Sequence, residues 1–110
     1  MLSLSYENFT KTKLNDPRNI LAIFCVDWCP FCTRFLKTFE GAIKGRTDPL
    51  AAVVDLTDES NPLWEEFKID VVPTLIGFRD GVEIVRKDGV GGVGLETLDL
   101  SDALRRMEKR

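Results

Sequence analysis

The stretch Asp27-Trp28-Cys29-Pro30-Phe31-Cys32 sets two thiols three positions apart at the junction of two contrasting patterns. Residues 20–26 form an apolar run without alternation, which is typical of a strand covered on both faces. After the motif, apolar side chains recur at helical spacing. We therefore expect both thiols where a buried strand ends and a helix begins. The free N–H groups at a helix start favour a thiolate, the reactive form of cysteine.

Helical spacing predicts different environments for the two thiols. At about 100° per residue, the stripe that faces the core consists of Cys32, Leu36, Phe39 and Ile43, with Phe35 beside it. Cys29 precedes Pro30, and proline is favoured at the first helical position. Cys29 should therefore occupy the N-cap, half outside the helix, with its sulfur near the free N–H groups. We predict that Cys29 is the attacking sulfur and Cys32 the more buried, resolving sulfur.

Length and composition narrow the functional classes. The 110 residues predict one domain, and 44% of them are apolar, enough for a proper core. The net charge of −3, with no basic cluster, argues against nucleic acid as a partner. No apolar run approaches the roughly 20 residues of a membrane span, and the first residues lack the pattern of an export signal. We expect a cytoplasmic monomer. The chain has no histidine, which excludes a Cys–His nucleophile pair and histidine-ligated metal.

The patterns predict a single three-layer α/β domain over residues 1–110, with a central mixed sheet of about four strands flanked by about four helices. Expected helices cover residues 5–14, 30–44, about 61–68 and from 97 onward, and expected strands cover 20–26, 50–56, 71–78 and 82–87. The first strand–helix–strand unit should form a right-handed parallel crossover. Asp80-Gly81 suits the tight turn of an antiparallel hairpin.

The Trp28–Cys32 motif after a buried strand, and Val72-Pro73-Thr74 opening a later strand, resemble the thioredoxin family over roughly residues 5–108. The resemblance implies a thioredoxin fold and thiol–disulfide exchange that maintains cell redox homeostasis. It implies a cis Pro73 beside the two sulfurs and a substrate groove lined by Trp28, Val72, Pro73 and Gly89, next to the motif residues Pro30, Phe31 and Thr74. Implied partners are proteins with disulfides and a thioredoxin-reductase-like or low-molecular-weight thiol reductant. No cofactor is implied.

Two departures from the family pattern bear on mechanism. Thioredoxins usually carry Gly-Pro between the cysteines, whereas Pro30-Phe31 is closer to the Pro-Tyr of glutaredoxins. Thioredoxins also bury an aspartate six residues before the first cysteine, where this chain has Ile23. The lysine that usually pairs with that aspartate would correspond to Val54, or to Asp55 after a one-residue shift. Asp55 is therefore a candidate for a replacement proton relay.

Other interpretations of the cysteines remain open on sequence alone. The pair could be a metal knuckle or an inert disulfide, could share an iron–sulfur cluster between chains or use glutathione as glutaredoxins do, or could belong to a redox-inert binding module. Cys25 fits a small buried hydrophobe, with a regulatory thiol as the alternative. Trp28 could be a core residue, and Trp64 is expected to be one. The chain has no histidine, and Arg34 is expected on the far side of its helix, so mainly the helix N-terminus should stabilise a Cys29 thiolate. We therefore predict a moderate reductant or isomerase-like exchanger rather than a strong oxidant.

Overall fold

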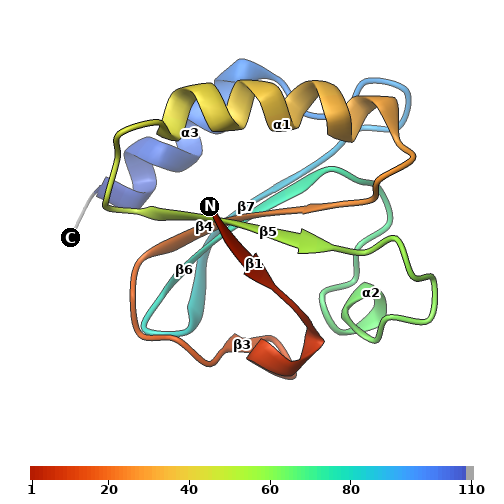
Figure 1. The fold of residues 1–110 in the computed structure, drawn as a ribbon, viewed down its shortest axis with the longest axis horizontal. Helices are drawn as coiled ribbons and strands as arrows, with labels where there is room; N and C mark the ends of the chain where they lie inside the picture. The colour runs from red at the N-terminus through yellow and green to blue at the C-terminus, as the bar shows by residue number, and fades with distance from the viewer. Residues whose placement is uncertain (109–110) are drawn as a thin grey trace.

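The computed structural model describes residues 1–108, in which a mixed five-stranded sheet lies between two layers (Figure 1). The sheet has the order β1-β5-β4-β6-β7 and consists of β1 (Leu2–Leu4), β4 (Ile20–Cys25), β5 (Leu50–Asp55), β6 (Thr74–Arg79) and β7 (Val82–Asp88). Helices α1 (Pro30–Ile43) and α3 (Thr97–Glu108) cover one face, and α2 (Leu63–Glu66) lies across the other. None of the helices within residues 1–108 has the length and apolar character that a bilayer crossing requires.

Strand β4 is the centre of the sheet, and all six of its residues are buried. It pairs in parallel with β5 and antiparallel with β6. The crossover through α1 joins β4 to β5, as the sequence predicts. The run 20–26 lacks alternation because helices and loops cover β4 on both faces. This arrangement brings the carboxyl ends of β4 and β5 to one edge, next to the start of α1.

The β6–β7 hairpin is confirmed, with an antiparallel register and a turn at Asp80-Gly81. Both turn residues have positive φ angles, 52° and 80°, which an Asp-Gly pair tolerates. Strand β6 begins at Thr74, three residues later than expected, and β7 forms the predicted edge of the sheet.

The helix expected over residues 5–14 is wrong. Residues Leu2–Leu4 form the edge strand β1, which accounts for the fifth strand, and Tyr6–Asn8 form one 3₁₀ turn, η1. Strands β2 (Phe9–Thr10) and β3 (Lys13–Leu14) then make a small hairpin. The spacing of Tyr6, Phe9 and Leu14 suggested one buried helical face. In the structure Phe9 and Leu14 are buried but Tyr6 is exposed, so that face does not exist. Three α-helices are present within residues 1–108, rather than about four.

The other helices are close to expectation. Helix α1 buries Cys32, Phe35 and Phe39, whereas Leu36 and Ile43 are only half-buried, so the core-facing stripe is centred nearer Phe35 than predicted. Helix α2 is a single turn, shorter than expected. Pro62 is its N-cap residue, and the Asn61 side-chain oxygen just before it accepts a hydrogen bond of 2.9 Å from the Leu63 N–H.

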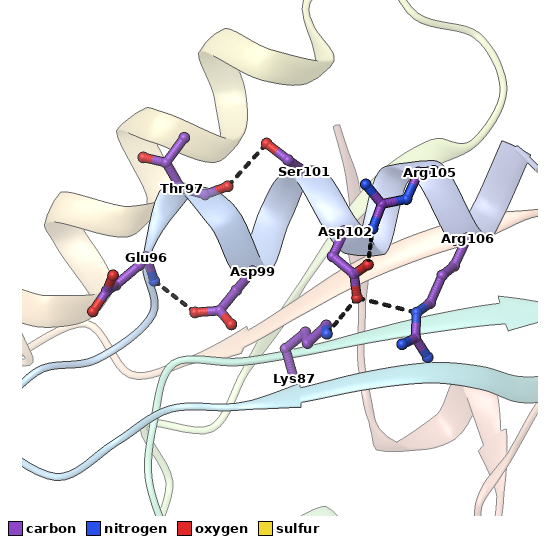
Figure 2. A network of polar contacts seen from close by, with 8 residues as sticks. All are labelled: Lys87, Glu96, Thr97, Asp99, Ser101, Asp102, Arg105 and Arg106. Atoms are coloured by element: carbon purple, nitrogen blue, oxygen red, sulfur yellow. Dashed lines mark hydrogen bonds and ion pairs between the residues drawn. The ribbon is translucent and has the colours of Figure 1, made fainter.

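Helix α3 buries the predicted face of Leu100, Ala103, Leu104 and Met107. Figure 2 shows that Asp102 on α3 pairs with Lys87 on β7 and with Arg105 and Arg106 on its own helix. These ion pairs attach α3 to the end of β7, where the glycine-rich segment 89–94 begins. The helix therefore helps to fix the segment that returns to the start of α1.

Candidate active site at the start of helix α1

The two motif thiols lie at the β4–α1 junction, and both are free. Cys29 is the N-cap with an extended backbone, and Pro30 is the first helical residue, as predicted. Cys29 is 7% exposed and Cys32 is 2% exposed, so the predicted order of burial is confirmed. The difference is smaller than expected, because Cys29 is buried rather than half outside. Its side chain also makes no hydrogen bond to the helix N–H groups, contrary to the expectation from sequence.

Cys32 has three hydrogen-bonding neighbours in an otherwise apolar setting. The Val26 N–H donates to its sulfur, and the thiols of Cys25 and Cys29 both contact it. The hydrogen bond with Cys25 raises the pKa of the Cys32 thiol well above its ordinary value, and burial adds to this effect. The same hydrogen bond lowers the pKa of Cys25, against the opposing effects of burial and of the negative charge of Asp55. Cys32 is therefore a neutral thiol at neutral pH.

A buried carboxylate is absent from the described part of the site. Ile23 occupies the position expected to depart from the family pattern, and it is fully buried between Val53 and Leu75. Within residues 1–108, Thr74 is the only buried polar or charged residue. Within residues 1–108, the side chains that contact Cys32 and can exchange a proton with it are therefore the thiols of Cys25 and Cys29, rather than a buried carboxylic acid.

Asp55 lies at the same edge but outside the core. It pairs with Cys25 in the β4–β5 register and is exposed to solvent. Its carboxylate accepts hydrogen bonds from the Thr57 N–H at 2.9 Å and from the Thr57 hydroxyl at 2.5 Å. The negative charge of Asp55 raises the pKa of Cys25, against the larger lowering effect of the hydrogen bond with Cys32.

The proline segment lies at the start of β6. The Val72–Pro73 peptide bond is cis, as the resemblance implied, and Pro73 is buried. Thr74 pairs with Phe24, the residue before Cys25, and its hydroxyl donates to the Val71 carbonyl at 2.7 Å. Pro73 therefore lies at the same sheet edge as the end of β4.

Gly89 lies directly against this proline segment. A methyl group built on Gly89 would overlap the Pro73 carbonyl oxygen and would lie 3.3 Å from the Val71 side chain. Because the nearest obstacle is backbone, only glycine fits at position 89 without displacing residues 71–73. The structure therefore brings Gly89 and Pro73 together, while Val72 is half-buried beside them.

The glycine-rich segment also packs on the first turns of α1, and Arg34 connects the two. The Arg34 guanidinium donates to the Val93 carbonyl at 2.9 Å and lies 5.3 Å from the centre of the Phe31 ring. A methyl group on Gly94 would lie 3.0 Å from the Phe31 Cβ. Arg34 thus faces this segment, a role that sequence reasoning missed because the two partners lie 59 positions apart.

Exposed apolar side chains adjoin the motif. Trp28 is 69% exposed, which rules out the core alternative for this residue, and Val90 and Val93 are also exposed. Trp64 is half-buried and its indole N–H donates to the Leu56 carbonyl at 3.1 Å, so it packs largely as expected. Within residues 1–108 no cluster of three or more cysteine or carboxylate side chains has the arrangement of a metal site.

Comparisons with known proteins agree with this geometry. The thioredoxin family profile matches residues 1–101. A thioredoxin from Mycolicibacterium smegmatis is 28% identical over 105 residues, covering 94% of both chains, and thioredoxin H3 from Arabidopsis thaliana is 34% identical over 68 residues, covering 61% of this chain and 57% of its own. The structure of Chlamydomonas reinhardtii thioredoxin f2 superposes with a TM-score of 0.79 at 18% identity, covering 98% of this chain and 96% of its own, which shows the shared fold. The chain belongs to the thioredoxin family.

Proposed function

We propose that this chain catalyses dithiol–disulfide exchange with disulfide-containing proteins, using Cys29 as nucleophile and Cys32 as resolving thiol. Family membership supports the general class of thiol–disulfide oxidoreductase. The observation that carries the finer assignment is the unequal burial of the two free thiols at the start of α1, 7% exposed for Cys29 and 2% for Cys32. The sulfur that must meet a partner protein needs access, whereas the resolving sulfur needs only to reach its neighbour.

The exchange proceeds in two balanced steps. The Cys29 thiolate attacks one sulfur of the partner disulfide, forming a mixed disulfide while the other partner sulfur leaves as a thiolate. Cys32 then loses its proton and attacks the Cys29 sulfur, and the second partner sulfur leaves and takes up a proton. The partner is reduced and the Cys29–Cys32 pair is oxidised. A thioredoxin-reductase-like protein or a small thiol restores the dithiol.

The raised pKa of Cys32 supports its resolving role. A neutral thiol does not compete with Cys29 for the first attack, because the thiolate is the nucleophile. The contact between the Cys29 and Cys32 thiols supports the second step, in which Cys32 attacks the mixed disulfide. Cys32 can therefore wait as a thiol until Cys29 has reacted.

A binding surface for the partner adjoins the motif. We assign it to Trp28, Val72, Val90 and Val93, of which Trp28, Val90 and Val93 are exposed. Trp28 directly precedes Cys29, and Arg34 fixes the Val93 backbone against α1. Val72, next to the buried Pro73, would offer its backbone to an extended segment of the partner, in the manner of an added strand.

Two variants that carry the same atomic change test the assignment. Cys29→Ser should abolish catalysed reduction of a protein disulfide by dithiothreitol, because the nucleophile is lost. Cys32→Ser should instead accumulate a mixed disulfide through Cys29, visible by mass spectrometry, because the second step is blocked. A Cys29→Ser variant that reduces the disulfide at the wild-type rate would refute the nucleophile assignment. Wild-type protein without any catalysis would favour a redox-inert binding module.

A further inference from the structure

A third cysteine shares the buried site with the two motif thiols. Cys25 is the last residue of β4 and is 8% exposed, in the same core cluster as Cys29 and Cys32. All three thiols are free. Cys32 contacts both of the others, so it lies between two possible disulfide partners.

The surroundings hold Cys25 in this position. Its carbonyl accepts a hydrogen bond of 2.7 Å from the Leu56 N–H, and its residue pairs with Asp55 across the sheet. The next residue, Val26, donates its N–H to the Cys32 sulfur. The end of β4 is therefore joined to Cys32 by a backbone contact from Val26 and by the thiol contact of Cys25. Because the Cys25 thiol already contacts the Cys32 thiol, the disulfide partner within its reach lies in the same chain.

We propose that Cys25 is a second disulfide partner of Cys32, so that the oxidised protein exchanges between a Cys29–Cys32 and a Cys25–Cys32 disulfide. This inference rests on the proposed function for the first oxidation, in which a partner disulfide is the oxidant. The exchange itself is redox-neutral. The Cys25 thiolate attacks the Cys32 sulfur, the Cys25–Cys32 bond forms, the Cys29–Cys32 bond breaks, and Cys29 leaves as a thiolate that takes up the proton lost by Cys25.

The exchange changes which step the oxidised protein can perform. In the Cys25–Cys32 form, Cys29 is again a free nucleophile while Cys32 is already bonded. Such a molecule can form a mixed disulfide with a partner but cannot release it through Cys32. Release then requires another thiol, such as one of the partner's own. Attack by a thiol of the partner rearranges its disulfides, whereas attack by Cys32 would reduce the partner.

The first test identifies the free thiol in the oxidised protein. Wild-type protein is oxidised with one equivalent of a protein disulfide, quenched in acid, unfolded and alkylated, and the modified cysteine is located by tandem mass spectrometry. The three cysteines lie in one tryptic peptide, residues 19–34. We expect two populations, one alkylated at Cys25 and one at Cys29. Alkylation at Cys25 alone would overturn the proposal.

The second test does not depend on the nucleophile assignment. Cys29→Ser leaves only Cys25 and Cys32, and we expect the monomeric variant to form a disulfide between them when diamide is the oxidant. Two thiols that stay free under conditions that fully oxidise wild-type protein would overturn the inference. Retained disulfide-reducing activity in the same variant would instead overturn the proposed function, so the two failures are distinguishable.

A third measurement links the two results quantitatively. A second oxidised form increases the equilibrium constant for oxidation of the protein. The factor of increase is one plus the ratio of Cys25–Cys32 to Cys29–Cys32 molecules. Cys25→Ser and Cys25→Ala should therefore both shift the redox equilibrium with dithiothreitol toward the dithiol by that factor, as measured in the first test. An equilibrium that moves in the opposite direction in both variants would contradict the exchange.

Discussion

Replacing Gly89 by alanine tests the contact between the glycine-rich segment and the proline segment. The added methyl group would overlap the Pro73 carbonyl oxygen and approach the Val71 side chain to 3.3 Å. Since the oxygen belongs to the backbone, the strain is relieved only by moving residues 71–73 or position 89 itself. Overpacking of this kind typically costs about 1–3 kcal/mol, a detectable part of the roughly 5–15 kcal/mol that stabilises a domain of this size.

Gly91→Ala is the matched control. The same methyl group at position 91 would meet nothing within 4 Å, and Gly91 does not have a positive φ angle. We expect this variant to match the wild type in stability or to exceed it by up to about 1 kcal/mol, because alanine restricts the unfolded chain. The pair therefore carries one chemical change with and without the contact to Pro73.

Two assays separate the fold from the site. Urea unfolding should show a lower midpoint for Gly89→Ala than for Gly91→Ala, with an unchanged slope. If Pro73 lies beside the sulfurs, as the family resemblance implies, displacement of its segment should also slow disulfide reduction, by about 10- to 100-fold for a shift approaching 1 Å. Equal stability of the two variants would refute the steric argument. Reduced stability with an unchanged rate would refute the placement of Pro73 in the substrate groove.

Two further substitutions test other contacts of the site. Gly92 and Gly94 both have positive φ angles, 77° and 81°, so alanine at either position should lower stability by about 1–2 kcal/mol in urea unfolding. Only Gly94→Ala also presses on Phe31, so only this variant should slow disulfide reduction. Equal reduction rates in the two variants would contradict a role for the Gly94–Phe31 contact in catalysis. The hydrogen bond with Lys87 lowers the pKa of Asp102, so its stabilising effect is present above the ordinary value of about 4 and is lost as pH falls through the lower folded pKa. The unfolding midpoint of Asp102→Asn should therefore lie below that of the wild type at neutral pH and converge with it in acid, and a gap that persists at the lowest pH would contradict the ion-pair assignment.

The sequence predicted the elements whose signals are local. Strand β4 and helix α1 follow from an apolar run, a proline at the first helical position and apolar side chains at helical spacing. The Asp80-Gly81 turn follows from backbone freedom at two adjacent residues. The order of burial of Cys29 and Cys32 follows from the same helical spacing, and it is confirmed. Each of these predictions depends on residues close together in the chain.

The N-terminal segment shows where local reasoning fails. Tyr6, Phe9 and Leu14 suggested one helical face, but residues Phe9–Thr10 pair with Lys13–Leu14 in a hairpin, and the preceding residues Leu2–Leu4 pair with β5, about 50 positions away. A short isolated helix is marginal in water, and the ring contacts of Phe9 with Phe24, Phe67 and Phe78 stabilise the hairpin instead. No local pattern in a three-residue strand announces such a partner.

The sequence by itself determined the chemistry available to this protein: three thiols, no histidine, and two of the thiols at a strand-to-helix junction. Only the tertiary structure decided which groups surround those thiols. It brought Cys25 against Cys32, Gly89 against Pro73, and Arg34 against Val93. The physical reason is that side-chain periodicity encodes which face of an element is buried, whereas the neighbours on that face depend on strand order and register across the whole sheet.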